Sequence, residues 1–246
     1  MPRIYLSPST QEGNFYVTGG TEESYMNRIA DEMEPYLTAN GIRFTRNTPD
    51  MTAASSIAQA NRLGGFDFYL ALHSNAAAPE NSGSVRGVLV FYYPTSAEGK
   101  RAADLFAANL KRVYPLPDLV RTVSTTALGE VRQPKYPANL LELGYHDNYA
   151  DAAWVENNMD AIARELARSL TEYFGLPFIE PQPVVQGTVS TSGSPLRLRA
   201  YPSAAGQTIA LMPNGASVTV YGTWQGWNVV HYNGSVGYAA EAYIES

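Results

Sequence analysis

The sequence predicts an α/β fold, a mostly parallel sheet with helices on both faces, followed by a small C-terminal all-β barrel. Three observations predict this arrangement. Residues 1–176 alternate strand-like apolar runs with helix-like amphipathic segments. Residues 177–184 contain three prolines and no periodicity, which is typical of a semi-rigid linker. Residues 185–246 form short apolar runs separated by turn signals such as Asn233-Gly234.

The elements of the first part follow from local patterns. A strand is expected at residues 3–7 and a helix at 21–33, with Glu22 and Glu23 in its first turn. Pro35 is expected to kink or end this helix. Further strands are expected at residues 41–46, 67–72, 87–93 and 139–144, and further helices at 55–65, 96–114 and 160–175.

The second part has the pattern of short strands and turns that is typical of a small barrel. Its strands are expected at residues 196–200, 208–212, 217–224, 227–234 and 235–240. Roughly sixty residues are within the range of domains that fold alone. The sequence therefore predicts two domains, 1–176 and 185–246, joined by the linker 177–184.

Composition excludes several classes of function. The net charge is −6, and 15 of the 17 basic and 21 of the 23 acidic residues precede residue 185. Neither part is basic, which argues against nucleic-acid binding. The absence of cysteine excludes disulfides, thiolate metal sites and cysteine nucleophiles. No segment approaches the ~20 apolar residues of a membrane span.

Polar residues gather where the predicted strands end. His73 follows one apolar strand, and Glu142 and His146 lie at the end of another. Ligands bind outside the carboxyl ends of parallel strands, so these side chains are expected at one edge of the sheet. The first helix begins at the same edge, and its phase favours Glu23 over the adjacent Glu22.

Glu142 interrupts the apolar run Leu140-Leu141-Glu142-Leu143. A carboxylate in that setting loses solvation and is either paired with a buried cation or functional. Partial burial would raise its pKa toward neutrality, which suits a general acid or base.

Together these residues indicate metal-assisted amide hydrolysis. His73, Glu23 and one further donor would hold zinc with an open position for water, and Glu142 would take the proton of that water. No G-x-S-x-G elbow supports a serine hydrolase, and no phosphate-binding loop supports nucleotide hydrolysis.

Four motifs in residues 3–176, "EESYMNRIA", "ALHSNA", "GVLVFYY" and "PANLLELGYHDN", make the chain resemble the zinc-dependent N-acetylmuramoyl-L-alanine amidases of bacterial cell walls. The resemblance implies that Glu23 and His73 bind Zn²⁺ and that Glu142 is catalytic. It also implies cleavage of the amide between the lactyl group of N-acetylmuramic acid and L-alanine of the stem peptide. Asn75, in the His73 motif, is expected to contact substrate.

One position departs from the family pattern. The family usually places its first zinc histidine in a glycine-rich loop after the first strand, where this chain has Thr10 and Gln11. We expect His146 to supply the third ligand instead, with Gln11 and Thr10 as weaker alternatives, because neutral imidazole binds zinc better than a carboxamide or hydroxyl.

The tail resembles bacterial SH3-like wall-binding domains, carried by "LRLRAYPSAAGQTIALMPNGASVTVYG" and "GWNVVHYNGSVGYAAEAYI". Trp224, Trp227 and Tyr238 are candidates for a ligand-facing groove, although aromatic residues equally close the core of a small barrel. The expected partner is peptidoglycan, through both glycan and stem peptide. The sequence leaves the oligomeric state open.

Two other functions stay open. One is a zinc peptidase that acts on the stem peptide, and the other is a metal-free wall-binding protein derived from an amidase. We expect a secreted or wall-associated protein, or a phage endolysin. The first residues enter a strand pattern directly, without a signal peptide, so export would need a leader already removed or another route.

Overall fold

The computed structural model describes residues 1–245, which form two compact units. One unit holds residues 3–34 and 44–173, and the other holds residues 1–2, 35–43 and the chain from residue 174 onward. The second unit includes the end of the first helix as well as the tail. These units are not the predicted domains 1–176 and 185–246, whose limits stay a prediction. No helix among the described residues has the length and apolar character of a membrane span.

The first unit contains a six-stranded sheet in the order β2-β1-β3-β6-β4-β5. Its strands are β1 (Arg3–Pro8), β2 (Arg43–Arg46), β3 (Phe68–Asn75), β4 (Val88–Tyr92), β5 (Val120–Ser124) and β6 (Ala138–Tyr145). The pairs β1–β3, β3–β6 and β4–β5 are parallel, and β4–β6 is antiparallel. The predicted α/β class is confirmed, with β4 and β5 running opposite to β6.

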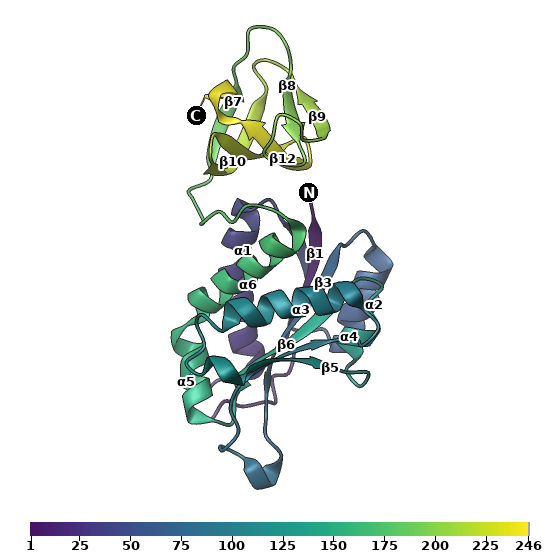
Figure 1. Cartoon of the computed structure of the whole chain (residues 1–246), viewed down its shortest axis with the longest axis vertical. Coiled ribbons are helices and arrows are strands. Elements are labelled where there is room, and N and C mark those ends of the chain that lie inside the picture. Colours follow the sequence, from purple (N-terminus) through teal and green to yellow (C-terminus); the bar gives the residue numbers. More distant parts are fainter. Residues whose placement is uncertain (246) are drawn as a thin grey trace. The chain divides into compact units, whose positions relative to one another are not determined.

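Helices lie on both faces of this sheet (Figure 1). They are α1 (Glu22–Ala39), α2 (Ala53–Leu63), α3 (Ala97–Leu110), α4 (Gly129–Arg132), α5 (Tyr149–Asn157) and α6 (Met159–Phe174), with 3-10 turns η1 (Pro79–Asn81) and η2 (Pro117–Leu119). Ile57 of α2 and Val131 of α4 pack with Tyr69 and Leu140 on one face. On the other face, Phe68 packs against Phe106 of α3 and against Tyr173 of α6.

Helix α1 does not end at Pro35, contrary to one of the two expectations for that residue. Met33 and Leu37, on either side of the proline, are fully buried. Their packing outweighs the backbone hydrogen bond that proline cannot donate. The helix ends instead before Gly41, whose φ of +67° suits glycine.

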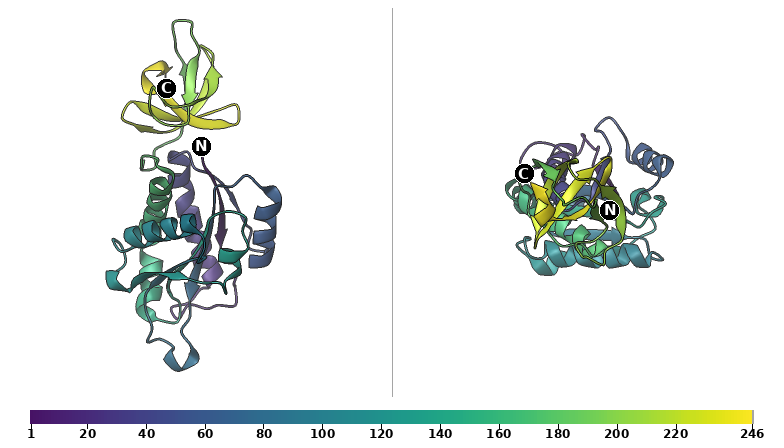
Figure 2. Two further views of the ribbon diagram at one scale, coloured as in Figure 1. Left: turned by 45° about the vertical axis from the view of Figure 1, so that its right-hand side comes forward. Right: turned by 90° about the horizontal axis from the view of Figure 1, so that it is seen from above.

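The C-terminal part forms a seven-stranded sheet in the order β13-β7-β10-β11-β12-β8-β9, with antiparallel pairs and strongly twisted strands (Figure 2). The strands are β7 (Val185–Val189), β8 (Leu196–Arg199), β9 (Thr208–Met212), β10 (Ser217–Trp224), β11 (Trp227–Tyr232), β12 (Ser235–Ala240) and β13 (Ile244–Glu245), with the 3-10 turn η3 (Glu241–Tyr243). Leu198, Met212, Val218 and Val230 form its core. Within residues 1–245 no pairing of β9 with β13 closes the sheet, so the all-β prediction holds but a closed barrel is not seen.

Candidate functional site

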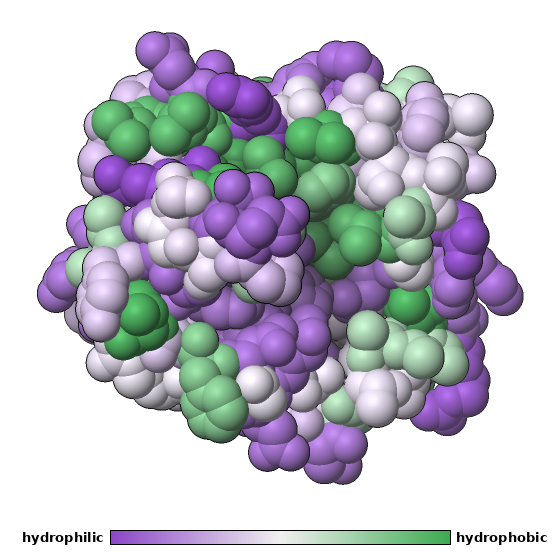
Figure 3. Space-filling view, turned by 90° about the horizontal axis from the view of Figure 1, so that it is seen from below, coloured by the Kyte–Doolittle hydropathy of each residue, from purple (hydrophilic) through white to green (hydrophobic). Residues whose placement is uncertain are grey.

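The site lies at the carboxyl-terminal edge of β1, β3 and β6. His73 and Glu142 are register partners on neighbouring parallel strands. Side chains alternate along a strand, so both lie on the same face of the sheet as Ala71 and Leu140, the face covered by α2 and α4. Hydrophilic residues occupy the centre of the molecular face seen in Figure 3, between hydrophobic patches.

The imidazole of His73 is held between two carboxylates. Its Nδ1 lies 2.8 Å from Oε1 of Glu22, and its Nε2 lies 2.8 Å from Oε2 of Glu130. Oε1 of Glu130 accepts hydrogen bonds from the hydroxyls of Ser7, at 2.7 Å, and Tyr69, at 2.8 Å. All five residues are buried. We call the central three residues the Glu22–His73–Glu130 network.

The network is ionic. Burial lowers the pKa of His73, but the hydrogen bonds and charges of Glu130 and Glu22 outweigh it and raise that pKa to about 10. Burial raises the pKa of each glutamate. The hydrogen bond and charge of His73, together with hydrogen bonds from neighbouring polar side chains, more than reverse this, so both carboxyl pKa values lie below the ordinary value. At neutral pH the ring therefore carries a proton on each nitrogen and donates one to each carboxylate.

Glu142 differs from Glu22 and Glu130 in its hydrogen bonding and in its pKa. Its Oε2 is inaccessible to solvent and has no hydrogen-bond partner among the described residues. Burial raises its pKa to about 7; the charge on His73 opposes the rise, and the charges on Glu22 and Glu130 add to it. The side chain therefore exchanges a proton near neutral pH, as a general acid or base must.

The loop after β1 closes one side of the network. Nε2 of Gln11 lies 3.3 Å from Nδ1 of His73, and the Asn14 amide donates to Oε2 of Glu22 at 2.6 Å. A cavity of about 240 Å³ opens beside it, lined by this loop with Thr10, by the start of α2, and by His73 and Glu130. Its size suits a small polar group rather than a whole muropeptide.

The structure places Glu22, not Glu23, at His73. The backbone N–H of Glu22 donates to the carbonyl of Asn14, and a β-bridge joins Phe15 to Thr21. These contacts fix where the helix starts and so which first-turn side chain faces the strand. Glu23 is partly exposed, and its carboxylate accepts no hydrogen bond among the described contacts.

His146 does not join the network. Its Nδ1 lies 3.1 Å from both the hydroxyl and the carbonyl oxygen of Ser74, whose side chain lies on the opposite face from that of His73. Asp147 accepts from backbone N–H groups of the η1 loop. The side chain of Asn75 accepts from the N–H of the next residue, at 2.9 Å.

These residues do not fit the zinc site that the family resemblance implies. Within residues 1–245 no group of three or more His, Asp or Glu side chains is arranged to hold a metal ion. Zinc in catalytic sites takes three protein ligands. Beside Nδ1 of His73 lie only the carboxylate of Glu22 and the carboxamide of Gln11, while Nε2 faces Glu130 on the other side of the ring.

The predicted aromatic residues of the tail divide into two kinds. Trp224 and Trp227 are half-buried and pair across the turn between β10 and β11. Tyr238 is fully buried, so its expected place in a ligand groove is corrected to a place in the core.

Glu130 is the site residue that the sequence did not reveal. It lies on α4, a single helical turn after β5, and neither element has a clear periodic signal. An acid flanked by apolar residues in "ALGEVRQ" was the one available sign, of the same kind that drew attention to Glu142.

Comparison with solved structures shows related folds at low sequence identity. The amidase AmiC2 of Nostoc punctiforme is 17% identical with a TM-score of 0.61, over 71% of this chain and 97% of that one. The catalytic domain of the amidase CwlV from Bacillus (Paenibacillus) polymyxa is 19% identical with a TM-score of 0.62, over 72% and 100%. The catalytic domain of the CD27L endolysin, which targets Clostridia difficile, is 18% identical with a TM-score of 0.58, over 70% and 98%.

Family models match both parts of the chain. The model of N-acetylmuramoyl-L-alanine amidases matches residues 8–172, and the model of bacterial SH3 domains matches residues 194–245. No curated protein sequence matches. Because the first match spans more than half of its length, the chain belongs to the N-acetylmuramoyl-L-alanine amidase family and carries a bacterial SH3 domain after the amidase domain.

Proposed function

We propose that this chain hydrolyses the amide between the lactyl group of N-acetylmuramic acid and L-alanine of the stem peptide, with Glu142 as the general base. Membership of the amidase family supports the reaction class. The observation that carries the role of Glu142 is a half-buried side chain with a pKa of about 7 at the strand edge where ligands bind, whose Oε2 is inaccessible to solvent and has no partner among the described residues.

In this step Glu142 acts twice. Its carboxylate takes a proton from a water molecule as the water oxygen forms a bond with the amide carbonyl carbon. The carboxyl group then gives that proton to the amide nitrogen as the carbon–nitrogen bond breaks. The products are a lactyl carboxylic acid and a free amino group on L-alanine, so atoms and protons balance.

No part of this step passes through a metal. The zinc requirement, with Glu23, His73 and His146 as ligands, stays a prediction from the sequence. The Glu22–His73–Glu130 network instead supplies a fixed, hydrogen-bonded set of charges beside Glu142. Burial is the main cause of the raised pKa of Glu142; the charge on His73 opposes the rise, and the charges on Glu22 and Glu130 add to it.

Glu142→Gln tests the proposal. The carboxamide has nearly the same volume but cannot accept the proton, so we expect release of stem peptides from purified peptidoglycan to fall ~10²- to 10⁴-fold. Folding should be unchanged by circular dichroism. Glu32→Gln, an exposed position on α1, is the matched control and should retain full activity. Substantial hydrolysis by a folded Glu142→Gln variant would overturn the assignment.

A second candidate function is peptidoglycan binding without hydrolysis. The observation that favours it is the absence, within the described chain, of a metal-binding group of three or more acidic or histidine side chains. Elemental analysis and product analysis separate the cases. New lactyl and amino ends support hydrolysis, with or without bound zinc, whereas wall binding with no new ends supports the second candidate. Cleavage within the stem peptide would instead indicate a peptidase.

We infer that the chain acts at the bacterial cell wall, as a secreted or wall-associated enzyme or as a phage endolysin. The combination of an amidase domain with a bacterial SH3 domain supports this place of action.

A further inference from the structure

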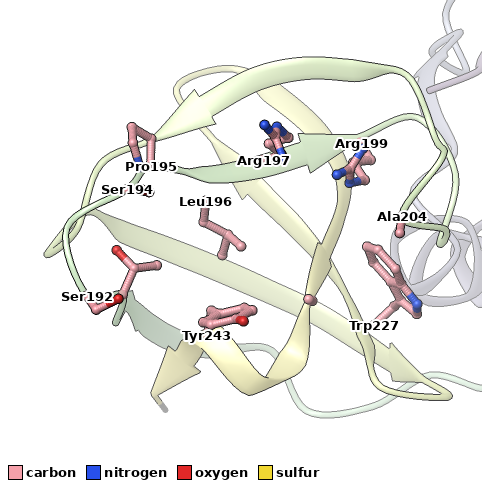
Figure 4. Close-up of a pocket in the computed structure, with 11 residues that line it drawn as sticks. Ser192, Ser194, Pro195, Leu196, Arg197, Arg199, Ala204, Trp227 and Tyr243 are labelled. Carbon is pink, nitrogen blue, oxygen red and sulfur yellow. The ribbon is translucent and has the colours of Figure 1, made fainter.

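The SH3 domain contains a cleft whose floor includes Leu196, a residue of its core. It has a volume of about 390 Å³, within the usual range of ligand pockets. Figure 4 shows Arg197 and Arg199 side by side on β8, with Trp227 and Tyr243 on the other side and Leu196 between them. Ser192 and Ser194 lie at one end.

The charge of this cleft is distinctive. Arg197 and Arg199 are the only basic residues in the sequence from 185 to 246, and both line it. The two acidic residues of the same segment, Glu241 and Glu245, do not line it. Concentrating every cation of a domain in one cleft creates a positive potential that attracts anions.

The two arginines have different roles. Arg199 is half-buried, and its guanidinium donates to the carbonyl of Gly206 at 2.7 Å, which anchors the loop between β8 and β9. Arg197 is exposed and makes no hydrogen bond or ion pair with any described residue. Its guanidinium is therefore free to form the paired hydrogen bonds that suit a carboxylate.

The aromatic walls add a second requirement. Tyr243 is 49% exposed and Trp227 is half-buried, so both present ring surface to a ligand while their edges pack in the domain. Such rings provide apolar contact at low cost in conformational entropy. A ligand that satisfies the whole cleft carries a negative charge next to an apolar or planar segment, as a peptide with free carboxylates does.

We propose that this cleft binds a carboxylate of the peptidoglycan stem peptide, with Arg197 as the anion-binding residue and Trp227 and Tyr243 as the walls. The proposal rests on peptidoglycan being the substrate polymer, and it assigns the SH3 domain to the peptide rather than to the uncharged glycan. A phosphate-bearing wall polymer shares the negative charge and is an alternative that the test separates.

The test uses the full chain and calorimetric titration with a soluble stem tetrapeptide. Arg197→Gln should weaken binding at least about tenfold, the loss expected for one charge-assisted hydrogen-bonding site. Arg197→Lys should recover part of the lost affinity for the peptide. Arg62→Gln, which removes an exposed charge from α2, should leave that affinity unchanged. Amidation of the peptide's carboxylates removes the charge that Arg197 would bind. The wild type should therefore bind the amidated tetrapeptide as weakly as the Arg197→Gln variant binds the free tetrapeptide.

A second measurement follows the wall of the cleft directly. The free peptide should change the tryptophan fluorescence of the wild type, and Trp227→Phe should abolish the change while Trp224→Phe retains it. Equal binding by wild type and Arg197→Gln, equal binding of free and amidated peptides, or tight binding only to a phosphate-bearing polymer would each overturn the proposal. The hydrolysis assay on Glu142→Gln is independent of these outcomes.

Discussion

At the scale of single residues, His73 lies at the predicted strand edge, and its imidazole is held between two carboxylates. A metal-binding imidazole offers one nitrogen as a lone pair and donates from the other. Here both nitrogens face carboxylates at 2.8 Å, and the pKa near 10 keeps both protonated. The charge of the ring is thus shared between Glu22 and Glu130.

Glu142 should leave a signature in stability as a function of pH. Its pKa rises from 4.5 to about 7 on folding, mainly through burial. The folded state thus binds the proton more tightly, and this stabilisation is present below pH 4.5 and is lost as pH rises through 7. Glu142→Gln should therefore gain stability over the wild type between these pH values, by up to about 3 kcal/mol.

Urea unfolding of both proteins from pH 4 to 8 measures this difference. The titrations of His73, Glu22 and Glu130, the charged groups facing Glu142, largely cancel because both proteins contain them. A constant difference across this range would show that Glu142 has an ordinary pKa in the folded protein.

At the scale of elements, periodicity predicted most of the long helices and strands, because their buried stripes dominate their packing. The same reasoning could not find β5, α4 and α5, which are short or lack a clear amphipathic stripe. It also favoured Glu23 over Glu22, because helix phase does not reveal the loop contact at Asn14 that sets the start of α1. Glu130 was missed because α4 is too short to show a periodic pattern. Glu22 was missed because the start of α1 depends on a loop contact.

The linker has an anchor that sequence patterns do not reveal. Asn40, fully buried just beyond α1, donates to the carbonyl of Ile179 at 2.8 Å and accepts from its N–H at 2.6 Å. Ile179 is itself buried. The side chain of Asn40 thus satisfies both backbone groups of one linker residue, as a neighbouring strand would.

Asn40→Ala should release this anchor. The variant leaves two backbone groups of Ile179 without partners, at a cost of about 1–3 kcal/mol if they stay buried. We expect a lower free energy of unfolding and faster proteolysis between residues 180 and 184. Asn61→Ala removes a similar pair of hydrogen bonds, to backbone groups of Gln133 and Lys135 on the exposed surface away from the linker, and serves as the control. Unchanged proteolysis in Asn40→Ala would show that the linker is held by other contacts.

At the scale of the whole molecule, the chain combines the sheet edge that holds the candidate site with an SH3 domain that has its own core. The residues of that core lie entirely within the tail, at Val189, Leu198, Met212, Val218 and Val230. A domain of this size is within the range that folds alone. The anchoring of Ile179 by Asn40 indicates that a cut should be placed after it, among exposed residues near Val184.

Cleavage of the chain near Val184 should therefore give two folded pieces with separable activities. Residues 1–184 should retain hydrolysis of soluble muropeptides, and residues 185–246 should retain affinity for intact wall, weakened further by Arg197→Gln. Because a linker turns the second contact into an intramolecular one, the full chain should bind wall up to about 10²- to 10⁴-fold more tightly than either piece. Sedimentation with purified walls measures all three. If residues 185–246 fold but do not sediment with any bacterial wall, the SH3 domain has no targeting role. If the full chain binds wall no better than residues 185–246 alone, the two domains do not bind the same polymer at the same time.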